Sequence, residues 1–465
     1  MRYISTRGRA PELGFDAALL AGLATDGGLY VPASWPRFSG AEWATMAGLD
    51  YAALAAKIIA PYMRGSVAEP KLVAITQQAY GTFTHKAVAP LVQLDSQLWL
   101  MELFHGPTLA FKDYALQLVG LLFDHVLKAR GSRITIVGAT SGDTGSAAID
   151  ACKDREAVDI FILHPAGRVS DVQRRQMTTV QSNNVHNIAV QGSFDDCQNL
   201  VKAMFADARF RTDLNLSAVN SINWARIMAQ IVYYAFAALR LGSEQRPVAF
   251  SVPTGNFGNV FAGYVAKQMG LPIAKFAVGS NRNDILTRYF ETGSMTANDV
   301  VPTLSPSMDI QISSNFERLL FSAYNNDGAA VASLMDRFKQ SGVYAVDAAA
   351  HAAIMDLFVG DRLDDVGTKA TMKSVFAATG HVVDPHTVIG IHAARALKTL
   401  PGTPVIALGT AHPAKFPDAV EAAIGQRPVL PAHLADLFTR PERLTTLGND
   451  LDQIKAYVRQ NARKI

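Results

Sequence analysis

The sequence predicts an α/β fold in which parallel sheets are covered by helices on both faces. From about residue 90 onward, short apolar runs alternate with amphipathic segments, and the runs end in Gly, Ser and Thr residues that lead into helical spacing. Alternation of this kind is typical of parallel strands joined by helices. Ligands of such sheets bind beyond the carboxyl ends of the strands, so the loops that follow strands are the first candidates for function.

The elements can be assigned in chain order from these patterns. Residues 1–90 are expected to be mainly helical with short strands, and helix-compatible patterns cover 51–63 and 70–79. The segment from about 290 to 400 is helix-rich and carries no independent chemical clue. The strands expected after residue 90 are 134–138, 159–163, 185–190, 248–252, 275–278 and 404–408, and helices are expected at 146–154, 194–210 and 224–241.

Composition argues against several classes of function. Hydrophobic residues make up 49% of the chain and charged residues 18%, which is typical of a globular protein with a large core. A net charge of +3 over 465 residues argues against nucleic acid as a main partner. Cys152 and Cys197 have no metal-ligand spacing and the histidines form no HExxH motif, so no metal site is predicted. No apolar run is long enough to span a membrane, and neither a signal sequence nor a disulfide framework is indicated, which favours the cytoplasm.

The loop at residues 105–113 leads into an expected helix and places a lysine at its start. Apolar residues at 115, 118, 119, 122 and 126 recur at helical spacing, so this face of the helix is expected to be buried. Lys112 lies between Phe111 and Asp113 at the first turn. A lysine is usually a solvated charge. The functional alternative is a desolvated amine whose lowered pKa lets it form and exchange imines.

Two further loops follow expected strands, and each taken alone is also compatible with an ordinary tight turn. The loop at 138–145 combines small residues with hydroxyls at a helix start, which suits a carboxylate or a phosphate. It lacks the lysine of a P-loop and the GxGxxG pattern, so a nucleotide site is the weaker interpretation. The loop at 253–259 interleaves two glycines with asparagines, which predicts a run of N–H donors for a phosphate monoester.

Together these motifs resemble the pyridoxal-phosphate-dependent enzymes of fold type II, the family of tryptophan synthase β, and more narrowly the threonine synthase family. The resemblance implies an N-terminal region at 1–90, a larger cofactor-binding domain at 91–130 and 220–465, and a smaller mobile domain at 131–219. The motifs that carry it are residues 3–8, 104–113, 139–145, 220–223, 253–259, 305–311 and 409–416.

The resemblance also implies the roles of individual residues. Lys112 matches the lysine that binds pyridoxal 5′-phosphate covalently and moves protons. Thr410 matches the hydroxyl that faces the pyridine nitrogen, and Asp143 lies where many relatives carry asparagine near the cofactor's 3′-oxygen. The loop for the cofactor phosphate is Gly255, Asn256, Phe257, Gly258 and Asn259. The residues expected to bind substrate are Thr140, Ser141, Gly142 and Thr144 at its carboxylate, and Arg168, Ser170, Asn220 and Asn223 at its phosphate, with Gln173, Arg174 and Arg226 as further candidates.

The implied reaction converts O-phospho-L-homoserine and water into L-threonine and phosphate, as the last step of threonine biosynthesis. It is a carbon–oxygen lyase reaction in which Lys112 moves protons at Cα and Cβ. Two alternatives remain open: a phospholyase that removes phosphate from a related phosphorylated amine without adding water, and a non-catalytic α/β binding protein. The chain is expected to be a monomer or a homodimer. His412 and Lys415 are expected only to shape the pocket around Thr410, and His105 to line the site, whereas His386 is expected to be a helix-start residue.

Overall fold

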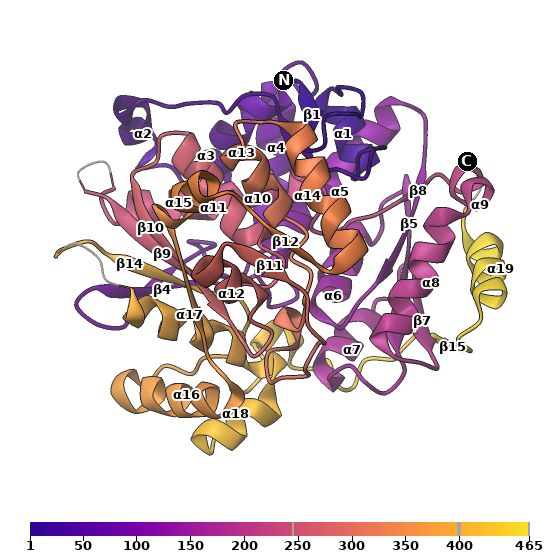
Figure 1. The fold of residues 1–465 in the computed structure, drawn as a ribbon. Helices are drawn as coiled ribbons and strands as arrows, with labels where there is room; N and C mark the ends of the chain where they lie inside the picture. Colours follow the sequence, from indigo (N-terminus) through magenta and orange to yellow (C-terminus); the bar gives the residue numbers. More distant parts are fainter. Residues whose placement is uncertain (244–245, 398–400, 464–465) are drawn as a thin grey trace.

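The computed structural model describes residues 1–465 except for 244–245, 398–400 and 464–465. Two sheets built mainly of parallel strands lie side by side, as the alternating sequence pattern predicts (Figure 1). Helices α5 (Lys112–Ala129) and α6 (Asp143–Cys152) pack against each other between the two sheets. None of the described helices is both long enough and apolar enough to cross a membrane.

The larger sheet has six strands, of which only β3 runs antiparallel to its neighbour. Neighbouring residues of one strand face opposite sides, so Phe250 belongs to the main core whereas Ala249 belongs to a second apolar cluster with Val388. Both faces are therefore covered by helices, as in other parallel sheets. The strands in spatial order are β13 (Phe358–Arg362), β10 (Ile273–Ser280), β9 (Val248–Pro253), β14 (Val405–Gly409), β4 (Leu98–Glu102) and β3 (Leu91–Gln93).

The smaller sheet has five parallel strands, and its two faces are also buried. Ile136 belongs to the main core, whereas Val137 and Phe161 face a separate cluster that includes Ile454 and Val458 from the end of the chain. The strands in spatial order are β15 (Thr445–Leu447), β7 (Val185–Val190), β6 (Val158–Pro165), β5 (Ile134–Ala139) and β8 (Leu216–Ser217).

The last residues of the chain differ from their expected place. The domain division predicted from the sequence assigns everything from residue 220 onward to the larger domain. In the structure, β15 pairs in parallel with β7, and α19 (Leu451–Asn461) packs on the outer face of the smaller sheet. A three-residue strand leaves too little pattern to be recognised in a sequence, which is why the prediction is wrong at this point.

Two expected helices are interrupted by residues that favour a break. The expected helix 194–210 ends at residue 206, because the Asp207 carboxylate accepts a hydrogen bond from the Phe210 N–H and starts a new helix. The expected helix 51–63 becomes a 3-10 turn at residue 60, beside Pro61. The helices in question are α8 (Phe194–Ala206) and α9 (Ala208–Asp213), and α3 (Tyr51–Ile59) and η1 (Ala60–Met63).

The remaining elements surround this framework. The N-terminal region is helical with a short antiparallel strand pair, as expected. It contains β1 (Tyr3–Ser5), α1 (Phe15–Ala21), β2 (Tyr30–Pro32), α2 (Gly40–Met46) and α4 (Glu69–Tyr80). The rest comprises α7 (Asp171–Thr178), α10 (Trp224–Arg240), α11 (Gly258–Gln268), α12 (Ile285–Thr292), β11 (Ser294–Thr296), η2 (Pro306–Met308), α13 (Phe316–Ala323), α14 (Gly328–Ser341), β12 (Val343–Ala345), α15 (Ala348–Met355), α16 (Asp365–Thr379), α17 (Pro385–Ala396), η3 (Pro413–Lys415), α18 (Pro417–Ile424) and η4 (Ala432–Leu434).

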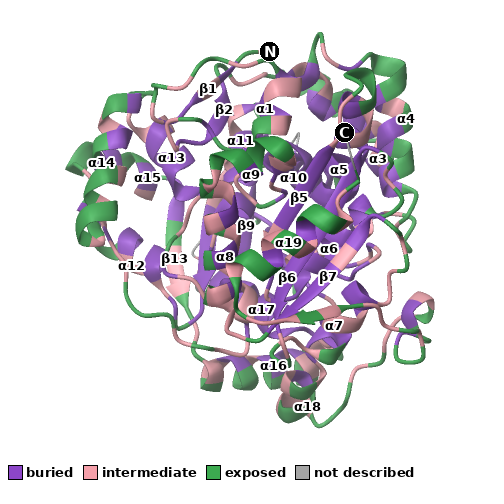
Figure 2. Cartoon of the chain, turned by 90° about the vertical axis from the view of Figure 1, so that its right-hand side faces the viewer, coloured by how far each residue is buried: buried purple, intermediate pink, exposed green. Residues whose placement is uncertain are grey.

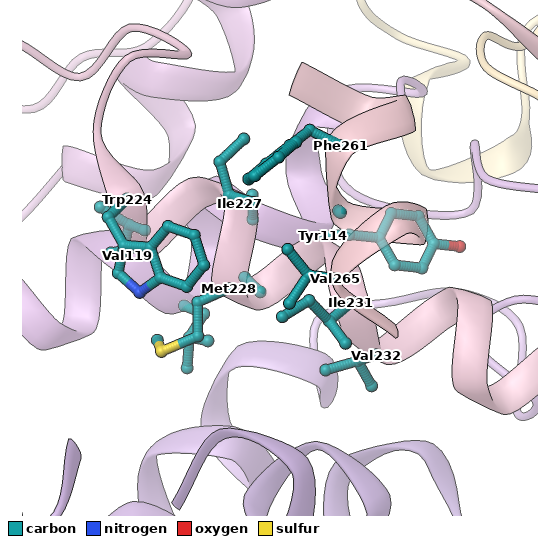
Figure 3. Packing of buried hydrophobic residues seen from close by; sticks show 14 of the residues in the cluster. Tyr114, Val119, Trp224, Ile227, Met228, Ile231, Val232, Phe261 and Val265 are labelled. Carbon is teal, nitrogen blue, oxygen red and sulfur yellow. The ribbon is translucent and has the colours of Figure 1, made fainter. Parts of the chain in front are cut away.

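The main core lies between α5, α10 and α11 and continues into both sheets. Figure 2 shows buried residues through the strands and the central helices, whereas α14, α16 and α18 expose much of their surface. Figure 3 shows side chains of α10 such as Trp224 and Ile231 packed against residues of α5 and α11. Because α5 begins at Lys112, its burial in this core fixes the position of that lysine.

Candidate active site

Three loops of the larger sheet meet at one edge, because the strands that precede them are parallel neighbours. Strands β9, β14 and β4 lie next to one another, and the loops after them carry residues 254–257, 410–415 and 103–111. Two of these loops also pair through their backbones. The Phe111 N–H donates to the Thr410 carbonyl at 2.9 Å, and the His412 N–H donates to the Leu109 carbonyl at 3.0 Å. The predicted site loops are thus brought together.

The loop before Lys112 is held by a buried carboxylate. Asp113 accepts hydrogen bonds from the Thr108 N–H at 2.8 Å and from the Thr108 hydroxyl at 2.6 Å. Gly106 lies so close that a Cβ there would be 2.5 Å from Asp113, so the loop requires glycine at this position. Burial raises the pKa of Asp113 to about 7, although the hydrogen bonds from Thr108 oppose the shift.

Lys112 lies beside a buried carboxylate that a second lysine also contacts. The Lys112 Nζ is 3.5 Å from the Asp143 Oδ2 and 3.5 Å from the Ser307 hydroxyl. The Lys415 Nζ is 3.0 Å from the Asp143 Oδ1 and donates to the Thr108 carbonyl at 2.6 Å. This cluster joins loops of both sheets, because Asp143 begins α6 in the smaller unit.

The charges of this cluster change the pKa values of its members. Burial lowers the pKa of the Lys112 amine, Asp143 opposes this effect, and the positive charges of Lys415 and Arg226 add to it. Burial alone would raise the pKa of Asp143, but Lys415 and Lys112 hold it well below its usual range. The site thus contains three basic side chains and one ionised carboxylate, which favours binding of anionic groups.

The predicted phosphate loop forms the start of helix α11. Phe257 has a left-handed backbone with φ of 60°, and a Cβ on Gly255 would lie 2.7 Å from the Ile310 side chain. The first N–H groups of a helix suit an anion. The Asn259 side chain points elsewhere, because its Oδ1 accepts hydrogen bonds from Tyr233 at 2.6 Å and Tyr234 at 2.8 Å. The Asn259 Oδ1 is therefore occupied, whereas its Nδ2 has no hydrogen-bond partner among the described residues.

The loop predicted to receive the substrate carboxylate is held in a tight turn by hydrogen bonds to the hydroxyl of Thr140. The Thr140 hydroxyl accepts from the Gly142 N–H at 3.0 Å and from the Gly145 N–H at 2.8 Å, so it shapes the turn. Ser141 and Thr144 lie half-buried on the same turn. The turn also touches Gln173, whose amide donates to the Asp143 Oδ1 at 2.8 Å.

Replacement of Gly142 by alanine is expected to disturb the lysine cluster. Gly142 has φ of 141°, and an added Cβ would lie 2.4 Å from the Gln173 side chain, which holds Asp143. We expect a loss of about 1–3 kcal/mol of unfolding free energy and a lower cofactor content, measured by denaturant unfolding and visible absorbance. Gly131→Ala is the matched control, because Gly131 has φ of 58° and no atoms near its Cβ. Equal cofactor content in both variants would contradict the prediction.

The residues predicted to bind the substrate phosphate are only partly brought together. Ser170 caps α7, and its hydroxyl donates to the Gln173 Oε1 at 3.0 Å, next to the cluster. Arg168 and Asn220 are exposed. Asn223 is fully buried and structural, since its amide donates to the Leu19 carbonyl at 2.8 Å and its oxygen caps α10. The structure does not bring the Asn223 side chain to the lysine cluster.

Two of the candidate arginines differ sharply in their surroundings. Arg174 forms ion pairs with Glu442 and Asp171 and is therefore neutralised. Arg226 is buried, its Nη1 donates to the Val219 carbonyl at 3.0 Å, and its Nε has no partner among the described residues. Burial lowers the pKa of Arg226 to about 10. A buried guanidinium without a carboxylate partner is costly unless an anion binds beside it.

Ser307 and its support were not identified as functional from the sequence. The Ser307 hydroxyl donates to the Asp143 Oδ2 at 3.1 Å, and its N–H donates to the His386 Nε2 at 3.2 Å. The His386 Nδ1 in turn lies 2.8 Å from the Asp384 Oδ1, which assigns the ring proton to Nδ1. Asp384 also binds the Thr387 hydroxyl, which accepts from the Thr410 N–H at 3.0 Å. The motif at 305–311 was the only sequence signal for this contact.

His105 and His412 lie beside the site in a separate cluster around Glu102. The Glu102 carboxylate binds the His105 Nε2 at 2.7 Å and the His381 Nε2 at 3.0 Å. Burial opposes ionisation of Glu102, but these histidines lower its pKa to about 2. Burial lowers the pKa of His412 to about 4, so this ring is neutral near neutral pH.

Comparison with known proteins places this geometry in context. Three family models match the chain: "Threonine synthase N terminus" at residues 2–80, "Pyridoxal-phosphate dependent enzyme" at residues 75–358 and "Threonine synthase, C-terminal" at residues 387–458. The chain is 56% identical to threonine synthase of Pseudomonas aeruginosa over 100% of this chain and 99% of that protein. It is 35% identical to threonine synthase-like 2 of Homo sapiens over 96% of this chain and 94% of that protein.

Solved structures give the same result. The structure of pyridoxal-phosphate-bound threonine synthase from Brucella melitensis has a TM-score of 0.98 and 53% identity, and the match covers all of both chains. Threonine synthase from yeast has a TM-score of 0.94 and 39% identity over 99% of this chain and 98% of that chain. These similarities extend over the lysine cluster and all the site loops described above.

Proposed function

The chain belongs to the threonine synthase family of pyridoxal-phosphate-dependent enzymes, and we propose that it converts O-phospho-L-homoserine and water into L-threonine and phosphate. The observation that carries this proposal is the buried Lys112 amine, which shares the Asp143 carboxylate with Lys415 and lies within the field of Arg226. A site of this charge suits a substrate that brings a carboxylate and a phosphate.

The cofactor of this enzyme is pyridoxal 5′-phosphate, and the residues present fit it. Lys112 supplies the desolvated amine that a carbonyl group requires, and the start of α11 supplies N–H groups for a phosphate. The close contact between Gly255 and Ile310 leaves no room for a side chain in this loop. When bound, the cofactor supplies a ring that stabilises negative charge at the substrate's Cα.

Lys112 is the group that moves protons. It begins α5 and its amine faces Asp143 and Ser307, so once the substrate amine has displaced it, it stays positioned as a base. Elimination of phosphate from Cγ requires loss of protons from Cα and Cβ. Water then adds its hydroxyl at Cβ, and protons are returned to Cγ, which becomes the methyl group, and to Cα, while the third proton leaves with the phosphate. One amine of lowered pKa can serve both carbon atoms in turn.

Arg226 is the residue we assign to the substrate phosphate. Its buried guanidinium lacks a carboxylate partner among the described residues, and its charge acts on Lys112. Replacement by glutamine is expected to lower kcat/KM for the phosphorylated substrate by about 10–100-fold, because a charge-assisted hydrogen bond is lost. Arg168→Gln is the comparison, because Arg168 was also predicted to bind this phosphate but is exposed. A larger loss of kcat/KM in Arg168→Gln than in Arg226→Gln would indicate that the substrate phosphate binds at the 167–174 loop instead.

The proposed reaction is tested by the products that the purified protein forms from O-phospho-L-homoserine. We expect equal amounts of threonine and phosphate, measured by amino-acid analysis and a phosphate assay. Formation of 2-oxobutyrate, or of phosphate without threonine, would favour the phospholyase alternative instead. Absence of any product and of visible cofactor absorbance would favour a binding protein.

The similarities favour threonine formation over both alternatives. Identity to the threonine synthase of Pseudomonas aeruginosa is higher than identity to the human threonine synthase-like protein, at 56% against 35%. The buried lysine and both anion-binding loops are intact, which argues against a binding protein without catalysis.

Three further properties remain proposals. Residues 131–219 would move together with β15 and α19 to close the site, since Asp143 and Gln173 reach the lysine cluster from this segment. Cys152 and Cys197 are free and buried, which supports a reducing, cytoplasmic setting. We propose a monomer or a homodimer, which light scattering would distinguish.

A further inference from the structure

Lys415 is completely buried beside the site, and we propose that it is a positioning residue that binds Asp143 and thereby leaves Lys112 as a neutral amine. Lys415 lies at the end of η3, after Thr410 on the loop that follows β14. The inference rests on the proposed function only in taking Lys112 as the amine that reacts.

The two lysines do not share the carboxylate equally. The Asp143 Oδ1 is 3.0 Å from the Lys415 Nζ, whereas the Oδ2 is 3.5 Å from the Lys112 Nζ, at the limit of a hydrogen bond. Each oxygen also has a neutral donor, since Gln173 donates to Oδ1 at 2.8 Å and Ser307 donates to Oδ2 at 3.1 Å. Lys112 is therefore the most distant of the four partners of this carboxylate.

Charge balance then decides which lysine keeps its proton. One carboxylate can neutralise one ammonium group, and a second buried ammonium group without its own counter-ion is costly. Lys415 has the closer carboxylate and a backbone carbonyl at 2.6 Å, so it is the better ammonium site. Lys112 has neither, and the loss of its proton reduces the excess positive charge of the site, to which Arg226 also contributes. Its pKa is lowered by burial and, in addition, by the positive charge of Lys415.

The position of Lys415 is tied to the loop that carries Lys112. The Thr108 carbonyl accepts from the Lys415 Nζ at 2.6 Å and from the Gln176 amide at 3.1 Å. The N–H and hydroxyl of Thr108 are held by Asp113, which follows Lys112 in the chain. The same short loop therefore fixes both lysines relative to Asp143.

Removal of Lys415 should make the carboxylate act on Lys112 alone. In Lys415→Met, Asp143 loses its closest counter-ion and stabilises the protonated form of Lys112, so the pKa of that amine rises. At a fixed pH below this pKa, the neutral fraction of the amine falls about tenfold whenever the pKa rises by one. Asp143→Asn in the same chain removes the carboxylate charge and should reverse the change, since an amide has nearly the same shape.

The test uses full-length protein freed of cofactor. The rate at which visible absorbance appears after addition of pyridoxal phosphate is measured as a function of pH, because it reports the neutral fraction of Lys112. We expect Lys415→Met to shift the acidic limb of this profile to higher pH and to slow the reaction about tenfold at neutral pH. In the double variant Asp143→Asn/Lys415→Met, the acidic limb should shift back towards the pH at which it lies in the unchanged protein. Lys57→Met, at an exposed lysine paired with Glu69, should leave it unchanged.

An unchanged profile in Lys415→Met would overturn the inference. Loss of the reaction at every pH in both the single and the double variant would also overturn it, because Lys415 would then be a purely structural residue. Threonine formation is not part of this test. Wild-type protein that forms no threonine would reject the proposed function, whereas the inference stands or falls on the pH profiles.

Discussion

Replacement of Lys112 by alanine is expected to abolish both the visible absorbance of the bound cofactor and turnover. The proposed roles of this amine are covalent attachment of the cofactor and proton transfer, and alanine places neither an amine nor a base beside Asp143 and Ser307. We expect kcat to fall by about 10³-fold or more, measured with O-phospho-L-homoserine at saturating concentration.

The fold of this variant should remain intact. Lys112 lies at the first turn of α5, and the face that packs in the core begins at Tyr114. Unfolding by denaturant should therefore show a free energy close to that of the unchanged protein. Lys128→Ala, at the far end of the same helix, is the control and should retain activity. Turnover that survives in Lys112→Ala would refute the assigned role.

Replacement of Trp224 by alanine is expected to lower the free energy of unfolding by about 3–5 kcal/mol, because a large buried ring leaves a cavity. Trp224 begins α10 and is almost completely buried. Its ring centroid lies 5.6 Å from that of Tyr62, 6.0 Å from that of Trp35 and 6.2 Å from that of Tyr3. The substitution thus loosens the contact between the N-terminal region and the central helix.

The loss is measured from the midpoint of urea unfolding with the slope held constant. Leu23→Ala is the control, since this side chain is 45% exposed and its removal should change stability by less than about 0.5 kcal/mol. A loss in Trp224→Ala no larger than that of the control would show that the N-terminal region contributes little to the core.

Part of the framework of the fold could be predicted, because the longer strands carry a local pattern. Strand 185–190 was predicted to the residue, and the other five predicted strands differ by a few residues at their ends, whereas β4 and β13 of the larger sheet were not predicted. The break at Asp207 was missed because an aspartate within a helical pattern is only a weak signal of a new helix start. Strand β15 has three residues and pairs with a strand more than 200 positions away, so no local pattern could reveal it.

The site was predictable only in part, for a related reason. Lys112 and the loops at 140–144 and 255–258 lie in motifs whose residues are close together in the chain. Ser307 meets Asp143 across 164 positions, and Lys415 meets Thr108 across 307 positions, so these contacts depend on the fold. Conversely, Asn223 lies in a recognised motif, but its side chain caps a helix in the core. A motif identifies a segment and does not show which of its side chains faces the ligand.

The contribution of the chain end to the smaller sheet has a consequence for biosynthesis. The chain enters this sheet at β5, leaves it after β8 and returns with β15 and α19 only after the whole larger sheet has been made. Until then, β7 is an open edge and the apolar face around Phe161 lacks its cover of Ile454 and Val458. The smaller sheet can therefore be completed only after residues 445–461 have been synthesised, and a nascent chain stalled before residue 445 would be prone to aggregate.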